Sequence, residues 1–197
     1  LWTIYTPIDC GACTSEQAYL ATKYVDRDIP HIPIVIDGEE SNGYTLSTTD
    51  WMPYAWSTNN VAHEEVANMA LAYFQAGRTD EGFRLLKSDL TDEMLLGNSP
   101  GNFGQISHYD RERNEAYRDF GDNVGITSRA IINGLFGITP DALNSRCIIK
   151  PAFPDHWDEA SIRTPYLSYT FHRKGNSDIY TIAQHFPQPL KIIVRTT

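Results

Sequence analysis

The sequence predicts a mainly α-helical protein that ends in an antiparallel β segment, and two observations support this fold class. Hydrophobic residues recur at helical spacing over about 61–76 and again over 79–93, with a short link between the two segments. After Pro140, short runs of β-branched and aromatic residues are separated by Pro and Gly-Asn turns. We therefore expect helical hairpins over 1–140 and a β domain over 141–197.

The first part of the chain is expected to hold one helix between extended segments. Residues 1–6 fit a short strand or an extended lead-in. Thr14 and Gln17 have the spacing of a capping box, which predicts a helix that starts at Thr14 and ends near Asp28. Residues 37–58 are rich in Gly, Ser, Thr, Asn and Asp, a composition that indicates a long loop.

The middle of the chain is expected to form an antiparallel helical hairpin. Asn59 or Asn60 would cap a helix over about 61–76, and Gly77 is suited to end it in a left-handed conformation. The second helix of the hairpin, over 79–93, follows after a short turn.

A second long loop, over 97–122, leads to a further helix over about 124–136. If this helix runs in the same direction as 61–76, with 79–93 antiparallel between them, both long loops emerge at one end. That end would collect Trp and Tyr rings, amides and several carboxylates. Rings stack on sugar faces, amides bind hydroxyls, and paired carboxylates perform glycosidic acid/base chemistry. The alternative is a solvated, charged loop region.

Composition excludes several functional classes. The net charge of −9 over 197 residues argues against a protein that binds nucleic acid through a basic face. No apolar run approaches the roughly 20 residues that a membrane-spanning helix needs. The chain starts at Leu1 without a signal-peptide pattern, so we expect a processed start or a part of a longer protein. Three cysteines do not make a disulfide framework and leave the redox compartment open.

Two short motifs have possible chemistry of their own. Cys10 and Cys13 form a CxxC motif, and a strand before it with a helix after it would match a thioredoxin-like redox site. The alternative is two small, half-buried residues before a helix. His63-Glu64-Glu65 is only the first half of an HExxH zinc motif, because residue 67 is Ala, and the metalloprotease reading is rejected. We expect no bound metal or other cofactor.

Three stretches carry a resemblance to a known family. They read WMPYAWSTNNVAHEEVANMALAYFQAGRTDEGFRLLKS, GDNVGITSRAIINGLFGITPDAL and IKPAFPDHWDEASI, and the turn Ala76-Gly77-Arg78 and the run 134–138 are the most telling. The chain resembles bacterial six-hairpin glycosidases, in which an (α/α)6 toroid is followed by a β domain. It also resembles an uncharacterised branch of that superfamily associated with polysaccharide degradation.

The resemblance implies a fold and a set of partners. Residues 1–140 would be the last part of the toroid, and the upstream remainder of the same protein would complete it. The activity would be hydrolysis of a glycosidic bond in a plant- or bacterial-type polysaccharide or oligosaccharide, in the periplasm or outside the cell. Two alternatives stay open, a non-catalytic glycan-binding protein on the same scaffold and a thiol-redox protein that uses Cys10 and Cys13.

Within this resemblance, the N-termini of the inner helices point at the substrate, so the two long loops should hold the site residues. The candidate acids or bases are Glu115, Asp119, Asp122 and Asp50. The candidate substrate-binding residues are Trp51, Trp56, Asn59, Asn60, His108 and Tyr109. The competing explanations are helix capping for Asp122 and core packing for the two Trp rings.

Overall fold

The computed structural model describes residues 1–49, 60–96, 108–110, 115–117 and 122–196; for residues 40, 108–110, 115–117 and 122 only the backbone is described. The helices are α1 (Trp2–Asp9), α2 (Ser15–Asp28), α3 (His63–Gln75), α4 (Thr79–Leu90) and α5 (Asp122–Arg129). The π-helical segments Thr91–Leu96 and Ala130–Leu135 continue α4 and α5, and a 3-10 turn spans Ala142–Asn144. The strands are β1 (His31–Ile36), β2 (Glu39–Leu46), β3 (Val61–Ala62), β4 (His108–Asp110), β5 (Glu115–Tyr117), β6 (Ile138–Asp141), β7 (Arg146–Ile149), β8 (Glu159–Arg163), β9 (Leu167–Lys174), β10 (Ser177–Gln184) and β11 (Lys191–Val194).

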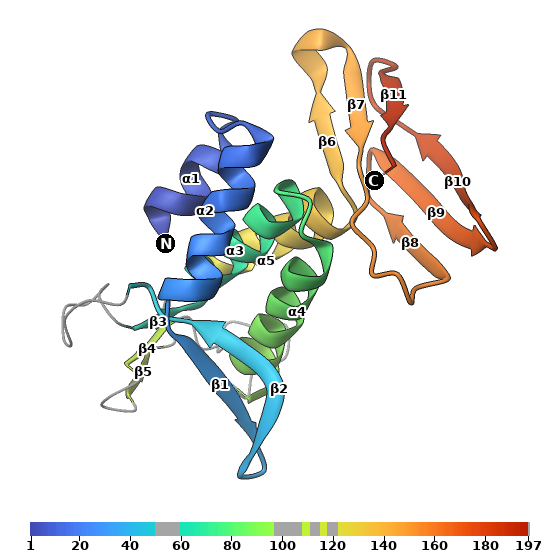
Figure 1. Ribbon diagram of the computed structural model, residues 1–197. Coiled ribbons are helices and arrows are strands. Elements are labelled where there is room, and N and C mark those ends of the chain that lie inside the picture. Colours follow the sequence, from blue (N-terminus) through green and yellow to red (C-terminus); the bar gives the residue numbers. More distant parts are fainter. Residues whose placement is uncertain (50–59, 97–107, 111–114, 118–121, 197) are drawn as a thin grey trace.

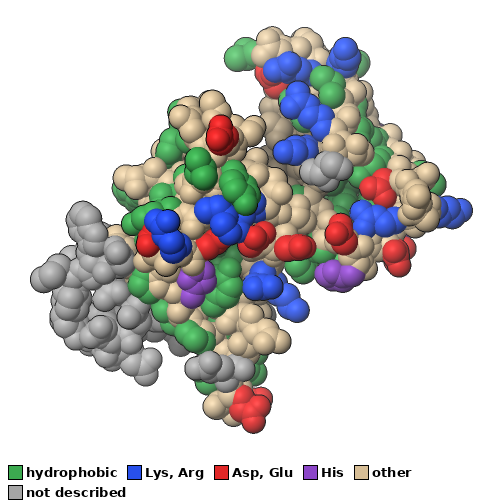
Figure 2. Space-filling view, viewed as in Figure 1, with side chains coloured by type: hydrophobic (Ala, Val, Ile, Leu, Met, Phe, Trp, Pro, Cys, Tyr) green, Lys and Arg blue, Asp and Glu red, His purple; other side chains and the backbone are tan. Residues whose placement is uncertain are grey.

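The fold is mixed α/β, with helices grouped around α3 and small sheets placed around them (Figure 1). The hairpin β1–β2 packs against α4, and the sheet β3–β4–β5 adjoins the start of α3. The sheets β6–β7–β11 and β8–β9–β10 stand side by side on the far side of the helices from α1 and α2 (Figure 1). In Figure 2, acidic and basic side chains are interspersed over both the helical and the β-rich parts.

Helix α3 is the centre of the fold. Every residue from Val66 to Phe74 is buried except Asn68, because α1, α2, α4 and α5 all pack against this helix. A helix that is apolar around most of its circumference has to be enclosed in this way. The closest packing is at its C-terminal end. A Cβ on Gly82 of α4 would lie 2.9 Å from the Phe74 ring, and a Cβ on Gly134 would lie 2.6 Å from it.

The C-terminal strands build a second part of the same core. Leu167, Tyr169 and Phe171 alternate inward along β9, as expected for a strand with one buried face. The Tyr169 hydroxyl donates a 2.7 Å hydrogen bond to the carbonyl oxygen of Phe136, just after the π-helical segment that continues α5. Phe153 packs against Phe136 and Phe171 with ring centroids 5.3 and 4.9 Å apart. Aromatic contacts therefore join the β-rich part to the helices.

The prediction of a toroid followed by a β domain is wrong. Short helices and small sheets make a mixed α/β fold, and strands lie within both regions predicted to be loops. Strand β2 occupies part of 37–58, while β4 and β5 lie within 97–122. These strands are polar or very short, so they lack the alternating pattern that identifies a strand in sequence. The sheet β6–β7–β11 also contains a parallel pair, β7 with β11, where only antiparallel pairing was expected.

Several local predictions are confirmed. Helix α2 begins with a capping box, in which the Thr14 hydroxyl accepts from the Gln17 N–H at 3.2 Å and the Gln17 side chain accepts from the Thr14 N–H at 2.9 Å. Gly77 has a left-handed φ of +76° and ends α3, so α3 and α4 form the expected hairpin. The runs predicted as strands after Pro140 are found in β7, β9, β10 and β11.

Other local predictions are wrong. Residues 2–6 belong to helix α1, with Leu1 at its N-cap position, and do not form a strand. Helix α3 has Ala62 at its N-cap position with no side-chain cap, because β3 leads directly into the helix and Asn60 lies two residues too early. None of the helices in the described ranges is long and apolar enough to cross a membrane.

Gly137 provides a test of the junction between the helices and the C-terminal sheets. Its φ is +64°, and a Cβ there would lie 1.9 Å from the Lys150 carbonyl oxygen. Gly175 also has a positive φ, +56°, but a Cβ there meets nothing within 4 Å. We expect Gly175→Ala to cost about 1–2 kcal/mol through backbone strain alone. Gly137→Ala should cost at least about 3 kcal/mol, because a backbone clash is added.

Urea unfolding of both variants measures this difference. Equal losses in the two variants would contradict the close approach at Gly137.

Candidate functional site

A buried cluster of one histidine and three carboxyl groups lies where the start of α3 meets the end of α4. His63, the first residue of α3, accepts or donates through Nδ1 at 2.7 Å from the Asp89 Oδ1 atom. Its Nε2 atom lies 3.7 Å from Oδ2 of Asp92. Glu93 follows Asp89 by four residues, so the helical segment presents both carboxyl groups on one side. His63, Asp89 and Glu93 are each 0% exposed.

Helix α5 completes the cluster by holding Glu93. The Asn123 side-chain amide donates to Oε2 of Glu93 at 2.8 Å, and the Thr127 hydroxyl donates to Oε1 at 3.3 Å. Asn123 and Thr127 are four residues apart and share one face of α5. The starts of α3 and α5 and the end of α4 therefore meet at one point. This confirms that α3 and α5 run in the same direction with α4 antiparallel to them.

Burial and mutual charge set the protonation of this cluster. Burial raises the pKa of the Glu93 carboxyl to about 8, the Asp89 charge adds to the shift, and the bonds from Asn123 and Thr127 oppose it only in part. Burial opposes the charged form of His63, but the Asp89 hydrogen bond and the nearby carboxylates raise its pKa above the ordinary value. Glu93 therefore holds a proton near neutral pH, as a general acid must.

The cluster also has the composition of a cation site. His63, Asp89 and Glu93 each offer one ligand atom, and these atoms lie within 4.8 Å of one another. However, His63 Nδ1 and Asp89 Oδ1 are only 2.7 Å apart, which is a hydrogen-bond distance. Both Glu93 oxygens already accept hydrogen bonds from α5. These contacts occupy His63 Nδ1, Asp89 Oδ1 and both Glu93 oxygens, whereas the buried Oδ2 atom of Asp89 has no hydrogen-bond partner among the described residues. We interpret the cluster as a proton-holding network because of the short contact between His63 and Asp89.

The described residues test the predicted site residues only in part. Asp50, Trp51, Trp56, Asn59 and Asp119 lie outside them. Asn60 is buried, and its backbone exchanges hydrogen bonds with Thr48, so it joins the two ends of the segment between them. A sugar-binding role for Asn60 stays a prediction.

The backbone of three other predicted residues, His108, Tyr109 and Asp122, lies next in register or sequence to the cluster, and that of Glu115 lies one strand further out. His108 and Tyr109 pair with Ala62 and Val61, the two residues that precede His63. Glu115 pairs with Asp110 on the next strand. Asp122 is the first residue of α5, directly before Asn123. That these loop residues act together as a site at one helix end stays a prediction.

Sequence reasoning missed the residues at the centre of the cluster. The sequence pattern excludes His63 only as part of a zinc motif, and it assigns no role to Asp89 or Glu93. One signal is present in the sequence. Asp89 and Glu93 follow the apolar residues Leu86 and Leu90 by three positions each, so two acids border the buried side of the helix. Acids on a core-facing side are rare unless they are paired or functional.

The CxxC motif does not have the layout of a thioredoxin-like site. Helix α1 precedes Cys10, so the expected strand before the motif is absent from this described segment. Both thiols are free, with Cys10 exposed and Cys13 half-buried. The Cys10 thiol lies 3.7 Å from the Pro7 carbonyl oxygen, its hydrogen-bond acceptor. The thiol-redox hypothesis thus loses the structural context that motivated it.

Comparison with known proteins adds no family. No protein-family model matches the chain, and no curated protein matches it either.

The Glu93 proton predicts a pH dependence of stability. The carboxyl pKa rises on folding from 4.5 to about 8, so the folded protein binds a proton that the unfolded chain releases between these values. The stabilisation is fully present below about pH 4.5 and is lost as the pH rises through about 8. We expect this group alone to lower the free energy of unfolding by several kcal/mol over that window.

Chemical denaturation at pH 5, 6, 7 and 8 measures this effect. The Glu93→Gln variant, which keeps the shape of the side chain, should lose less stability with rising pH than the wild type. Parallel pH profiles for the two proteins would show that Glu93 is ionised throughout.

Proposed function

We propose that the protein is a carbohydrate-active hydrolase that cleaves a glycosidic bond with the Glu93 carboxyl as proton donor. The observation that carries the proposal is a buried carboxyl whose pKa is raised to about 8 and whose two oxygens are positioned by Asn123 and Thr127. Glu93 is 0% exposed, so the proposal requires that substrate binding opens a path to this carboxyl. A carboxylic acid that stays protonated at neutral pH is the group that glycosidases use to protonate the leaving oxygen.

The surroundings of Glu93 support this chemistry. Helices α3 and α5 both begin beside it, and the positive ends of their dipoles would stabilise the carboxylate that remains after proton transfer. The His63 ring, bonded to Asp89, lies near enough to act on the Glu93 charge. After Glu93 gives its proton to the leaving oxygen, the resulting carboxylate is stabilised by the donors Asn123 and Thr127 and by the His63 charge.

A second carboxylate is needed to activate water or to attack the sugar. Glu115 and Asp122 are the two predicted acids whose backbone is described. Asp122 directly precedes Asn123, and Glu115 lies on the outer strand of the sheet whose strand β3 leads into His63. The proposal assigns this role to one of these two residues. Its identity also sets the stereochemistry, since carboxyl groups about 5–5.5 Å apart retain the anomeric configuration and groups about 6.5–9.5 Å apart invert it.

The substrate class and the location follow the resemblance to six-hairpin glycosidases. The substrate would be a plant- or bacterial-type polysaccharide or oligosaccharide, met in the periplasm or outside the cell. The mixed α/β fold of this chain means that the resemblance contributes motifs to the proposal and no architecture.

Release of reducing sugar from a panel of plant and bacterial polysaccharides tests the activity. On a substrate that the wild type cleaves, Glu93→Gln should lower kcat by about 10²–10⁴, because the proton donor is lost while the shape is kept. One of Glu115→Gln and Asp122→Asn should cause a loss of similar size. Glu159→Gln, on the exposed strand β8, removes a carboxyl far from the cluster and serves as the matched control.

Wild-type rates for Glu93→Gln would reject the assignment of the proton donor. Binding of a glycan without any cleavage by the wild type would favour the non-catalytic glycan-binding alternative. Inactivation by EDTA with recovery on adding Zn²⁺ would instead identify the cluster as a metal site.

A further inference from the structure

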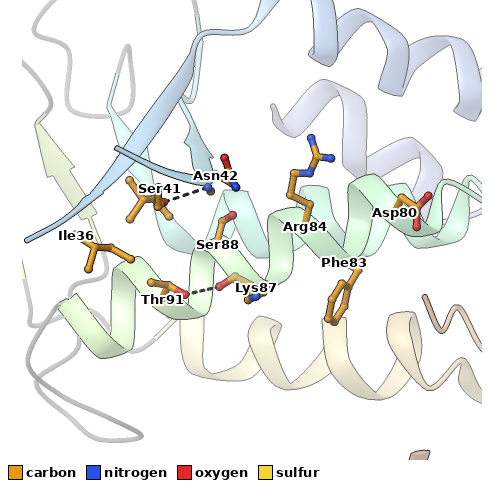
Figure 3. Close-up of a pocket in the computed structure, with 11 residues that line it drawn as sticks. Ile36, Ser41, Asn42, Asp80, Phe83, Arg84, Lys87, Ser88 and Thr91 are labelled. Atoms are coloured by element: carbon orange, nitrogen blue, oxygen red, sulfur yellow. Dashed lines mark hydrogen bonds between the residues drawn. The ribbon is translucent and has the colours of Figure 1, made fainter. Parts of the chain in front are cut away.

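A groove follows α4 on the side that faces the hairpin β1–β2 (Figure 3). Its volume is about 460 Å³, within the range of small-molecule binding sites. In Figure 3, Ser41 and Asn42 of β2 lie across from Ser88 of α4 and from Thr91, the first residue after α4. The groove is distinct from the acidic cluster, which occupies the side of α4 that faces α3.

The helical wall of this groove is basic in an acidic protein. Arg84 and Lys87 are exposed, one turn apart, and neither forms an ion pair within the described ranges. Lys and Arg side chains are visible over α4 in Figure 2. Among the described residues that line the groove, the acidic one is Asp80. It lies in the first turn of α4, at the opposite end of this helix from Ser88 (Figure 3). With a net charge of −9 for the chain, two unpaired cations side by side favour a negatively charged ligand.

Two hydroxyl groups add hydrogen-bond donors beside these cations. The Ser41 hydroxyl oxygen accepts from the Gly43 N–H at 3.0 Å, and the Ser88 hydroxyl oxygen accepts from the Tyr44 N–H at 3.2 Å. A hydroxyl that accepts a backbone N–H still has its own hydrogen to donate. Within the described part of the chain, neither hydroxyl donates to another group. The backbone therefore holds both serines ready to donate to a ligand.

Gly43 brings these two hydroxyls to one place. A Cβ on Gly43 would lie 2.9 Å from the Ser88 Oγ atom and 3.3 Å from the Ser41 Oγ atom. The missing side chain thus lets both hydroxyl oxygens approach the backbone of Gly43. Ser41 and Ser88 both line the groove, so their hydroxyls can donate together to a bound anion.

We propose that this groove binds the oxyanion of an acidic sugar, through Arg84, Lys87, Ser41 and Ser88. The oxyanion is a carboxylate or a sulfate ester, and both suit a site built from donors. The choice of a sugar as its carrier rests on the proposed function, whereas the preference for an oxyanion rests on the groove alone. Acceptors for sugar hydroxyls are also present, since the Thr91 hydroxyl already donates to the Lys87 carbonyl oxygen and keeps its lone pairs.

Isothermal titration of the full chain with three probes tests the proposal. The probes are trigalacturonic acid, the neutral maltotriose and sodium sulfate. We expect trigalacturonic acid to bind more tightly than either of the others, and its affinity to fall as NaCl rises from 20 to 500 mM. The double variant Arg84→Gln/Lys87→Gln should lose about tenfold or more in affinity, while Lys191→Gln, on the exposed side of β11, should keep the wild-type value.

Gly43→Ala separates the donor geometry from the charge. It keeps both cations and places a methyl group between the two serine hydroxyls, so it should weaken trigalacturonate binding while circular dichroism and thermal unfolding stay close to the wild type. Equal affinity for maltotriose and trigalacturonic acid, or unchanged affinity in the double variant, would overturn the proposal. Sulfate binding without trigalacturonate binding would overturn the acidic sugar as ligand.

The readout also keeps this proposal separate from the proposed hydrolysis. Glu93→Gln should bind trigalacturonic acid as the wild type does, because Glu93 lies outside the groove. If the wild type binds trigalacturonic acid but hydrolyses no polysaccharide, the oxyanion site is supported and the proposed hydrolase activity is rejected. If it hydrolyses neutral polysaccharides and does not bind trigalacturonic acid, the hydrolase activity is supported and the oxyanion site is rejected.

Discussion

The enclosure of α3 is the constraint on which the rest of the structure depends. Helices on several sides remove water from nearly the whole length of α3, and any polar group on it then needs a partner within the protein. His63 meets this requirement through Asp89, and Tyr73 donates a 2.7 Å hydrogen bond to Asp26 of α2. Arg78, just after the hairpin turn, reaches the same Asp26 carboxylate at 2.6 Å. Each polar contact fixes a neighbouring helix against α3.

Helix α4 gains two different environments from this arrangement. Its side toward α3 carries Asp89 into the buried cluster, where burial raises the carboxyl pKa of both Asp89 and Glu93. Its side toward β2 carries Ser88 to an open groove, where water allows Arg84 and Lys87 to stay charged. The adjacent residues Ser88 and Asp89 therefore lie in different environments, Ser88 beside the groove and Asp89 in the buried cluster. The proposed hydrolase would use the first side for proton transfer and the second for recognition.

Agreement between sequence and structure is best where structure is local. The capping box at Thr14, the left-handed Gly77 and the alternating strand β9 each depend on a few neighbouring residues, and each was predicted. Strand β2 was missed because its polar sequence, which includes Asn42 and Gly43, is ordinary for a loop. It becomes a strand through pairing with β1 and packing on α4, neither of which leaves a periodic signal.

The candidate site likewise combines features that follow from local sequence with features that depend on tertiary contacts. Residue types and spacing alone were enough to expect acids gathered where α3 and α5 begin, because the direction of the helical hairpin follows from its short turn. They did not identify Glu93, because a carboxyl in a helix reads as a solvent-exposed residue until its neighbours are known. Three segments distant in the chain bury Glu93 together, and burial is what shifts its pKa to about 8. Proton affinity in a protein interior is a property of the enclosing contacts, so the tertiary structure alone could decide which acid holds the proton.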